Sequence, residues 1–580
     1  MKTTTQLASL TENSIQPVSK QCLSDGTLFL TFPRAAFGTL MLSLLPRNSD
    51  RTVVFHLGEK LDTTGRIDRT PPGTIRYRRT VQAIQAGQST CRLRIPPDKR
   101  NTGPAAIKMP AEVGEVFPFR YVEIENAESL SIDSVDQIAV WYPFDDNAAH
   151  FESSSDTLNA VWDICKYTIK ATTFCGVYVD GDRERIPYEG DAYINQLGHY
   201  CVDHEYDFAR YSHEYMLHYP TWPTEWHLHS VMMAWADYLY SGETKSLHTF
   251  YDVLRAKTLI DFARDDGLIS TDKDLRTPEM EARLEAHYET GIIKRNIRDL
   301  VDWPPGSFTD GGIGERDNHE MLPVNTVVNA FHAHALQLMA LIAKAVGKMD
   351  DHHFFEQQAQ RVTARINAVL FDKARGIYTD GEGSTHASLH SNMFMLAFGL
   401  VPQDRKQSVL AFVKSRDMAC SVYGSQHLLD ALYANGEADH ALALMTAKHD
   451  RSWWNMIQTG STMTLEAWDL RYKNNLDWNH AWGAAPANII PRHVLGVQPL
   501  NPGFSEIIIN PQPASLTYAK GKVPTPHGAV EVELHNDAGK KTFELHAKTP
   551  SKCTAHIRVA ARYLTDRNTN ITLNGKTVIV

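Results

Sequence analysis

The sequence lacks the features that mark several large classes of protein. None of its seven cysteines lies in a Cys-x-x-Cys pair, which argues against a zinc ribbon and against a disulfide framework. No run of about 18 or more apolar residues occurs, so we expect no segment that spans a membrane. The formal net charge is only -10 over 580 residues, and no block of Lys and Arg stands out. Nucleic acid is therefore not an expected partner.

A recognisable leader is also missing from the sequence as it stands. Residues 1–20 contain no apolar stretch of the kind that a secretory signal needs. The scattered cysteines are expected to be free thiols, which suits a reducing compartment. We therefore expect a cytoplasmic protein, or a periplasmic one if a signal peptide has been removed.

Three parts differ in the period of their apolar residues. Residues 1–150 contain short alternating runs separated by Pro, Gly and Asp turns, which predicts an N-terminal β-sandwich. Residues 151–495 carry apolar side chains at steps of three and four, which predicts amphipathic helices. Residues 496–580 alternate again and predict a C-terminal β domain. The expected fold is a multidomain α+β protein.

The helical part has room for about a dozen helices of ordinary length. Paired helices in that number fit an (α/α)₆ toroid. Periodicity alone does not separate a toroid from a solenoid, but no repeat of fixed length favours the solenoid. We therefore expect residues 151–495 to form an (α/α)₆ catalytic domain.

Charged side chains crowd into residues 180–191. The segment holds Asp180, Asp182, Arg183, Glu184, Arg185, Glu189 and Asp191. Gly and Pro within it predict a loop that enters a helix near its end. A solvated charged loop is the simple alternative. The flanking segments are apolar, however, and like charges on a partly buried loop split the pKa values of their members. A carboxylic acid can stay protonated near neutral pH in this way and serve as a general acid.

A second segment combines a carboxylate with aromatic residues. Glu466 lies beside Trp468, and His480 follows Asn479 between two further tryptophans. Each residue alone fits a helix cap or a satisfied core position. Together they resemble a sugar subsite, with an aromatic platform, a few polar groups and one carboxylate.

Glycoside hydrolysis needs two carboxyl groups on opposite sides of the scissile bond, and they need not be close in sequence. Glu184 and Glu466 are the candidates. A separation of about 6.5–9.5 Å would mean inversion of the anomeric centre, and one of about 5–5.5 Å retention.

Several motifs, in the same order, resemble family 78 glycoside hydrolases, the bacterial α-L-rhamnosidases. Residues 184–191 are similar to the family's acid loop, E-R-x-G-W-x-G-D, and residues 462–469 to its W-E-x-W-D segment. Asn479-His480 with Gly483 is similar to N-H-x-x-G, and Asp302-Trp303 to a D-W pair. Pro187-Tyr188 stands where Gly-Trp is usual, and the shortened loop leaves the family's upstream Asp matched by Asp180 or Asp182.

The resemblance implies the same fold and an inverting, exo-acting α-L-rhamnosidase. It makes Glu184 the general acid and Glu466 the general base. The other residues expected at the substrate are Asp180, Asp182, Arg185, Tyr188, Asp191, Asp302, Trp303, Trp468, His480 and Trp482. We expect a carbohydrate substrate, no metal and no organic cofactor, because protonation and water activation suffice.

Three other functions fit parts of the sequence. A polysaccharide lyase on the same fold would use a Tyr or His base and a cation, and it would draw on Arg185, Tyr188, Tyr193, His199 and His213. A metal enzyme would draw on His227 and His229, but residues two apart on a helix face different directions. A non-catalytic sugar-binding protein would not need both glutamates.

Overall fold

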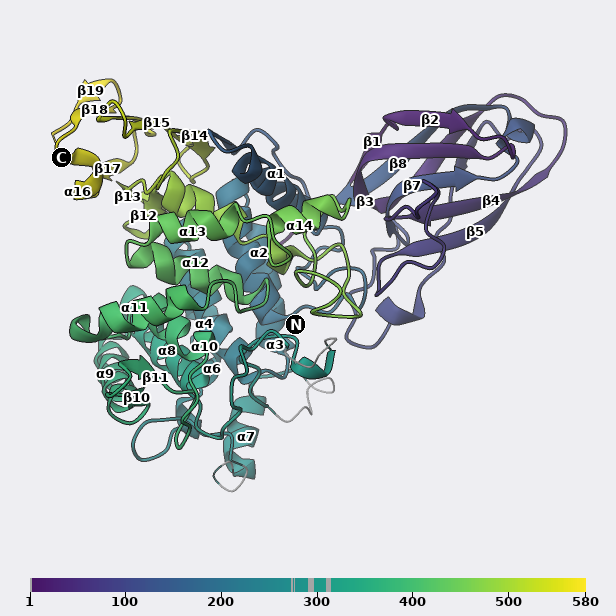
Figure 1. The fold of residues 1–580 in the computed structure, drawn as a ribbon. Helices are drawn as coiled ribbons and strands as arrows, with labels where there is room; N and C mark the ends of the chain where they lie inside the picture. The colour runs from purple at the N-terminus through teal and green to yellow at the C-terminus, as the bar shows by residue number, and fades with distance from the viewer. Residues whose placement is uncertain (1–2, 273–274, 276, 290–296, 309–313, 580) are drawn as a thin grey trace.

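The computed structural model describes residues 3–272, 275, 277–289, 297–308 and 314–579. Within these ranges the chain forms an N-terminal sheet domain, a ring of helices and C-terminal sheets (Figure 1). The N-terminal domain stands to one side of the ring, and the C-terminal sheets lie on another side, next to α1 and α13.

Antiparallel strands build the N-terminal domain. They are β1 (Thr11–Ile15), β2 (Ser19–Cys22), β3 (Leu28–Leu44), β4 (Arg51–Gly58), β5 (Tyr77–Ile84), β6 (Thr90–Arg92), β7 (Phe117–Ile124) and β8 (Ile132–Trp141). The sheet order is β1-β8-β3-β7-β4-β5, and β2 and β6 also pair with β3. The register of β3 against β7 shifts between Thr31 and Ala36, and such an irregularity bends a strand. The eight strands of the predicted sandwich belong to one hydrogen-bonded sheet, in which the long β3 pairs directly with β2, β6, β7 and β8.

Six inner helices form a closed circuit. They are α2 (Glu189–Val202), α4 (Thr224–Ser241), α8 (Thr326–Ala345), α10 (Leu389–Ala397), α12 (Gly424–Ala434) and α15 (Pro486–Ile489). In the described part of the chain, each contacts the next in this order, and α15 contacts α2. A solenoid would leave its end helices apart, so the predicted (α/α)₆ toroid is confirmed.

Each inner helix has an outer partner packed against it. The outer helices are α1 (Asp156–Ala171), α3 (Asp207–His218), α6 (Tyr251–Lys257), α9 (Met349–Val369), α11 (Lys406–Ser415) and α13 (Ala438–Met445). The shorter elements of this part are α5 (Lys245–Thr249), α7 (Pro278–Glu285), β10 (Phe371–Asp372), β11 (Ile377–Tyr378) and α14 (Trp453–Gln458).

Helix α8 shows why the ring is apolar inside. Asn325 caps it by accepting a hydrogen bond from the backbone N–H of Val328, a common way to begin a helix. It touches α4, α9 and α10, and a helix with neighbours on most sides is apolar all round. Of the described helices, α8 alone is long and apolar enough to cross a membrane by composition, and most of it is buried in the ring.

The C-terminal part consists of two sheets. One contains β12 (Val497–Pro499), β13 (Glu506–Ile509) and β17 (Thr554–Ile557); the other contains β9 (His150–Ser153), β14 (Tyr518–Val523), β15 (Val530–Asp537), β16 (Thr542–Lys548), β18 (Asn568–Leu573) and β19 (Lys576–Thr577), and α16 (Ala561–Leu564) lies between β17 and β18 in the chain. Strand β9 precedes the first helix of the ring, yet it pairs with β14. The apolar core runs without a break from the helices into these sheets.

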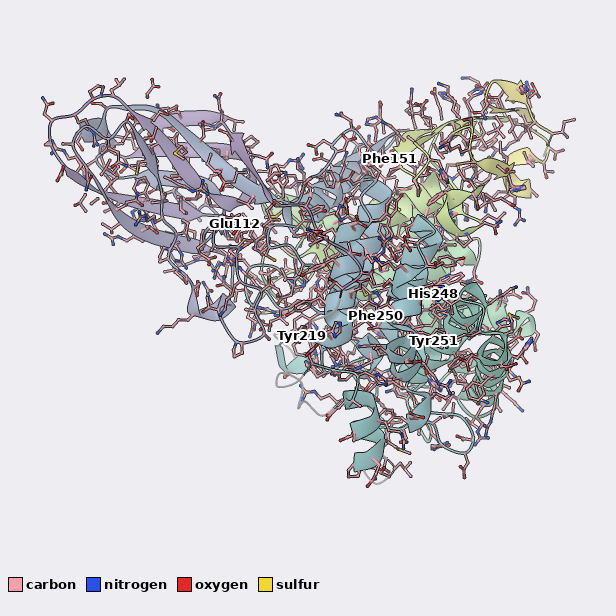
Figure 2. The ribbon with its side chains drawn as sticks, turned by 180° about the vertical axis from the view of Figure 1, so that it is seen from behind. Glu112, Phe151, Tyr219, His248, Phe250 and Tyr251 are labelled. Carbon is pink, nitrogen blue, oxygen red and sulfur yellow. The ribbon has the colours of Figure 1, made fainter. Side chains whose placement is uncertain are left out.

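Phe151 of β9 tests whether this junction stabilises the fold. Its side chain is 5% exposed, and its ring centroid lies 5.9 Å from that of Trp162 in α1 (Figure 2). Because replacing a buried Phe by Ala costs about 3–5 kcal/mol, Phe151→Ala should lower the midpoint of thermal unfolding clearly. Phe354→Ala is the matched control, since Phe354 on α9 is 38% exposed. Equal midpoints for both variants would contradict a stabilising junction.

Candidate active site

One cavity collects most of the residues that the sequence singled out. Its volume is about 220 Å³, and it is lined by Asp180, Arg183, Glu184, Tyr188, Asp191, Trp222, Trp226, Arg298, Leu300, Trp303, Glu466, His480 and Trp482. These residues belong to the first turns of α2 and α4 and to the segments that lead into α2, α4, α8 and α15. The cavity therefore lies where inner helices begin, and the helix dipole favours negative charge there.

The loop of residues 180–188, called the acid loop below, joins this cavity to the start of α2. Gly181 has φ +106°, and a Cβ atom on it would lie 2.6 Å from the carbonyl oxygen of Asn479. The side chain of Asn479 accepts a hydrogen bond from the backbone N–H of Asp182 at 2.9 Å. Only glycine fits this conformation and this close approach, so the loop is fixed against the segment that carries His480.

Glu184 lies at the mouth of the cavity. Its side chain is 40% exposed, and the Tyr188 hydroxyl donates a hydrogen bond to Glu184 Oε2 at 3.1 Å. The Tyr188 ring is held edge-on against Trp226, with the ring centroids 5.3 Å apart. Glu184 is therefore oriented by the cavity wall and open to a ligand from outside.

Glu466 is buried deeper and lies between two cations. Arg183 Nη1 is 2.7 Å and Lys473 Nζ 3.0 Å from Glu466 Oε2. Burial alone would raise the pKa of Glu466, but attraction to Arg183 and Lys473 outweighs it and lowers the pKa to about 2. The carboxylate is thus ionised at neutral pH. The same guanidinium reaches toward Glu184, whose Oε1 is 3.9 Å from Arg183 Nε.

His480 bridges two carboxylates. Its Nε2 lies 2.7 Å from Asp191 Oδ1 and its Nδ1 3.4 Å from Asp477 Oδ1. Burial would lower the pKa of His480, but the two carboxylates raise it well above its usual value. Burial raises the pKa of Asp191, and the His480 charge opposes this. The pair presents a fixed acceptor and a positive charge at the cavity floor.

Ligand atoms of Glu466, Asp477 and His480 lie within 4.8 Å of one another, as metal ligands do. Arg183 and Lys473 already neutralise Glu466, and a protonated His480 offers no lone pair. The donor set therefore suits an internal ion-pair network better than a bound cation.

Asp180 has an incompletely paired carboxyl group. Its Oδ1 accepts a hydrogen bond from the backbone N–H of Ile186 at 3.0 Å. Its Oδ2 is buried without a hydrogen-bond partner in the described part of the protein. Burial raises the pKa of Asp180 well above its usual value, although Arg183 opposes this. Burial thus disfavours the charged form of Asp180, and its Oδ2 can form a hydrogen bond with a ligand.

Four of the expected substrate-binding residues do not line the cavity. The side chains of Asp182 and Arg185 are buried on the inner side of the acid loop, where Asp182 Oδ1 is 2.7 Å from Arg185 Nη2. Asp302 accepts a hydrogen bond from the backbone N–H of Ser421 at 2.9 Å and lies 2.7 Å from His390 Nε2. Trp468 donates from its indole N–H to the Cys420 carbonyl. Asp182, Arg185, Asp302 and Trp468 thus lie outside the cavity lining and contact other protein groups, and their contact with substrate stays a prediction.

The N-terminal domain holds the acid loop through Asp182 and Arg185. Arg76 Nε is 2.6 Å from Asp182 Oδ2, and Asn101 Nδ2 donates to Asp182 Oδ1 at 3.1 Å. Glu115 Oε1 is 2.6 Å from Arg185 Nη2. These contacts, called the latch below, make the N-terminal sheet part of the framework of the cavity.

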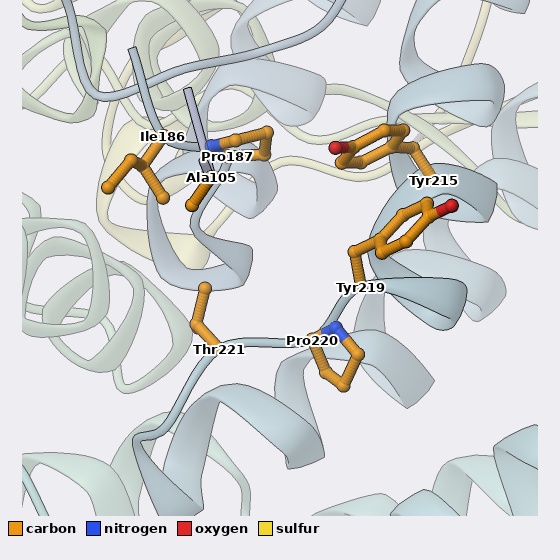
Figure 3. Close-up of a pocket in the computed structure, with 7 residues that line it drawn as sticks. All are labelled: Ala105, Ile186, Pro187, Tyr215, Tyr219, Pro220 and Thr221. Carbon is orange, nitrogen blue, oxygen red and sulfur yellow. The ribbon is translucent and has the colours of Figure 1, made fainter. Parts of the chain in front are cut away.

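A second, smaller cavity lies behind the same loop (Figure 3). It is lined by Ala105, Ile186, Pro187, Tyr215, Tyr219, Pro220 and Thr221. In Figure 3 the ring of Tyr215 points toward Pro187. The volume of about 30 Å³ is that of about one water molecule. This space is too small for a sugar. Its walls are the back of the acid loop and the end of α3, so these two segments pack closely together.

Of the residues proposed for other functions, Tyr188 lines the main cavity, and the histidines and Tyr193 lie elsewhere. His199 Nδ1 is 2.7 Å from the Tyr178 hydroxyl, and burial lowers the pKa of His213 to about 3. His229 Nδ1 is 2.8 Å from the Glu225 carbonyl. His227 and Tyr193 are likewise outside the residues that line the main cavity. They pack in the helical ring and bring no base to Glu184 or Glu466.

Sequence reasoning missed several residues at the cavity. They are Arg183, Trp222, Trp226, Arg298, Leu300 and Lys473. Arg183 could have been found, because it stands between the acids of the loop. Lys473 and Arg298 come from segments without a motif, and only the fold brings them to the site.

The latch can be tested with Asp182→Asn. The change leaves two buried guanidinium groups without their shared charge, and removing one partner of a buried ion pair costs about 3–5 kcal/mol. We expect the backbone amides of residues 180–187 to exchange hydrogen at least about tenfold faster, as measured by mass spectrometry.

Glu123→Gln is the matched control. Glu123 is also fully buried and is paired with Arg66 and Arg69, but its recorded partners lie outside the acid loop. It should lower stability without speeding exchange in the loop. Equal exchange in both variants would show that the latch does not order the loop.

Comparison with known proteins finds relatives for two parts of the chain. Residues 146–494 match the profile described as the bacterial alpha-L-rhamnosidase 6 hairpin glycosidase domain, and residues 496–570 match the bacterial alpha-L-rhamnosidase C-terminal domain. An alpha-L-rhamnosidase of Alteromonas sp. (strain LOR) is 26% identical over 306 residues, which are 49% of this chain and 32% of that protein.

Solved structures share the fold. The α-L-rhamnosidase from Dictyoglumus thermophilum superposes with a TM-score of 0.74 at 18% identity, over 94% of this chain and 58% of that one. The Streptomyces avermitilis α-L-rhamnosidase, solved with L-rhamnose, gives 0.71 at 18% identity, over 94% and 50%. The chain thus spans less than two thirds of the length of each of these relatives.

Proposed function

Because the chain belongs to the bacterial α-L-rhamnosidase family, we propose that it is an inverting, exo-acting glycoside hydrolase that releases L-rhamnose from a rhamnoside. The observation that carries this proposal is the pair of glutamates at one cavity. Glu184 is half-exposed and oriented by Tyr188, whereas Glu466 is buried and ionised. An acid near the leaving group and a base near the water are what inversion requires.

The proposed reaction is a single displacement. Glu184 donates its proton to the glycosidic oxygen, and the leaving group departs as an alcohol. Glu466 takes a proton from a water molecule while that water forms a bond to the anomeric carbon. Both carboxyl groups end in the opposite protonation state, and exchange with solvent restores them.

The other cavity residues would bind the sugar. Asp180 offers its buried Oδ2 to one sugar hydroxyl, and Asp191 accepts a hydrogen bond from another. Trp303 and Trp482 offer apolar faces to the C–H groups of the ring. The volume of about 220 Å³ is below the roughly 300–1,000 Å³ of pockets for drug-sized ligands, which favours one terminal sugar and hence exo action.

The lyase alternative has no support. Its candidate cation, Arg185, is taken up by Asp182 and Glu115. Its candidate bases Tyr193, His199 and His213 lie outside the residues that line the cavity. Tyr188 does line the cavity, but burial raises its pKa well above the usual value and its hydroxyl donates to Glu184. The family model and the curated relatives are named as rhamnosidases.

Glutamine variants test the two roles. We expect Glu184→Gln and Glu466→Gln each to lower kcat for 4-nitrophenyl α-L-rhamnoside by about 10²–10⁴, the usual range for lost acid–base catalysis. Proton NMR of the wild-type reaction should show β-L-rhamnose as the first product, which is the mark of inversion. Glu112→Gln, on the surface of the N-terminal domain (Figure 2), is the control.

An inactive wild-type enzyme on every rhamnoside tried would refute the function. Full activity in either glutamine variant would instead refute that residue's role. First release of α-L-rhamnose would leave the function intact and overturn inversion.

The pH dependence of kcat/KM should depend on the positive charges beside Glu466. Activity requires ionised Glu466 and is lost as the pH falls through its pKa, which the cations hold at about 2. Lys473→Met removes one positive charge and raises this pKa. The acidic limb of kcat/KM should therefore move to higher pH, whereas Lys473→Arg keeps the charge and should leave the limb near its original place. Superimposed profiles for Lys473→Met and wild type would contradict this electrostatic account.

A further inference from the structure

A positive charge without an ion-pair partner among the described residues lies at the mouth of the cavity. Arg298 is exposed and lines the cavity beside Trp222. Its guanidinium carbon lies 4.1 Å from the centroid of the Trp222 indole ring. Within the described ranges Arg298 forms no ion pair, so its only recorded side-chain contact is with an aromatic face.

The remaining charges of the cavity balance one another. Arg183 pairs with Glu466, and His480 pairs with Asp191. Burial disfavours the charged form of Asp180, and a general acid carries its proton when it acts. When Glu184 carries its proton, the positive charge of Arg298 is therefore left without a negative partner among the described residues of the cavity.

A second guanidinium, that of Arg316, contacts the residue before Trp303. Arg316 donates through Nε to the Asp302 carbonyl at 2.8 Å. Burial lowers the pKa of Arg316, the charges of Asp302 and Glu225 raise it, and the charge of Arg298 lowers it further. Because two carboxylates compensate Arg316, its charge differs from that of Arg298.

Arg298 is held on the side of the acid. Its backbone N–H donates to the Trp222 carbonyl at 3.3 Å, and its carbonyl accepts from the N–H of Thr224 at 2.9 Å. The helix that begins at Thr224 carries Trp226, which packs on Tyr188, the hydrogen-bond partner of Glu184. The proton donor of a glycosidase faces the leaving group, so Arg298 faces the leaving group as well.

We propose that the group leaving with the glycosidic oxygen carries an oxyanion, a sugar carboxylate or a sulfate ester, and that Arg298 binds it. This inference rests on the proposed rhamnosidase activity. The planar guanidinium matches the two oxygens of such a group, and its stacking on Trp222 fixes its plane before binding. The substrate class would be rhamnosides of acidic sugars rather than of neutral ones.

The test compares three disaccharides that differ only beyond the rhamnose. They are rhamnosyl glucuronate, its carboxyl-reduced form rhamnosyl glucose, and rhamnosyl glucose carrying one sulfate. We expect wild type to hydrolyse at least one acidic disaccharide with a kcat/KM about tenfold or more above that of the neutral one. The better of the two acidic compounds identifies the oxyanion, and the preference should shrink as salt is added.

Arg298→Gln should bring the ratio of acidic to neutral kcat/KM close to one, and Arg298→Lys should restore part of it. Arg405→Gln is the matched control, because Arg405 also stacks on an aromatic ring, that of Phe371 at 4.1 Å, but lies outside the residues that line the cavity. Equal rates on all three disaccharides, or an unchanged ratio in Arg298→Gln, would overturn the proposal.

Failure of the proposed function would be seen separately. If neither 4-nitrophenyl α-L-rhamnoside nor any of the disaccharides is hydrolysed, the activity itself is wrong. Binding of methyl glucuronide and methyl glucoside is then followed by tryptophan fluorescence in wild type and Arg298→Gln. This measurement tests the anion site without requiring hydrolysis. Tighter binding of the glucuronide that depends on Arg298 supports the anion site, and equal binding of the two sugars refutes it.

Discussion

A buried ion pair between two domains sets the geometry of the whole site. Asp182 belongs to the acid loop, whereas Arg76 belongs to the end of the N-terminal sheet, and neither reaches solvent. A carboxylate without water keeps its charge only next to a cation. The loop therefore cannot leave the sheet without exposing or stranding charge. Glu184, the proposed proton donor, is two residues further along the same loop, so the ion pair also fixes the position of Glu184.

The same principle organises the cavity. Charged groups at its floor occur as pairs, in which Arg183 and Lys473 face Glu466 and His480 lies between Asp191 and Asp477. Strong pairing keeps the base ionised at the cost of some basicity. It also leaves few free charges to attract the wrong ligand, which makes the open guanidinium of Arg298 stand out.

Much of this could be read from the sequence, and the exceptions have physical reasons. The change of apolar period located three parts, and the spacing from Glu184 to Asp191 with the Asn479-His480 pair brought the main cavity residues together. Ring closure was open, because it depends on contacts between α2 and α15 that no local period records. The contacts of Asp182 and Arg185 with the N-terminal domain could not be read from the sequence, because neighbours in a loop point to opposite sides. Lys473 and Arg298 gave no signal, since their partners lie far away along the chain.

Strand β9 has a consequence for how the chain is made. It is synthesised before any helix of the ring, but its hydrogen-bond partner β14 belongs to the C-terminal sheet. Until β14 leaves the ribosome, β9 has no strand partner and both of its edges are open. A nascent chain that stops within the ring therefore exposes an unpaired strand next to the apolar ring of Phe151. Synthesis of β14 removes this opportunity for wrong pairing.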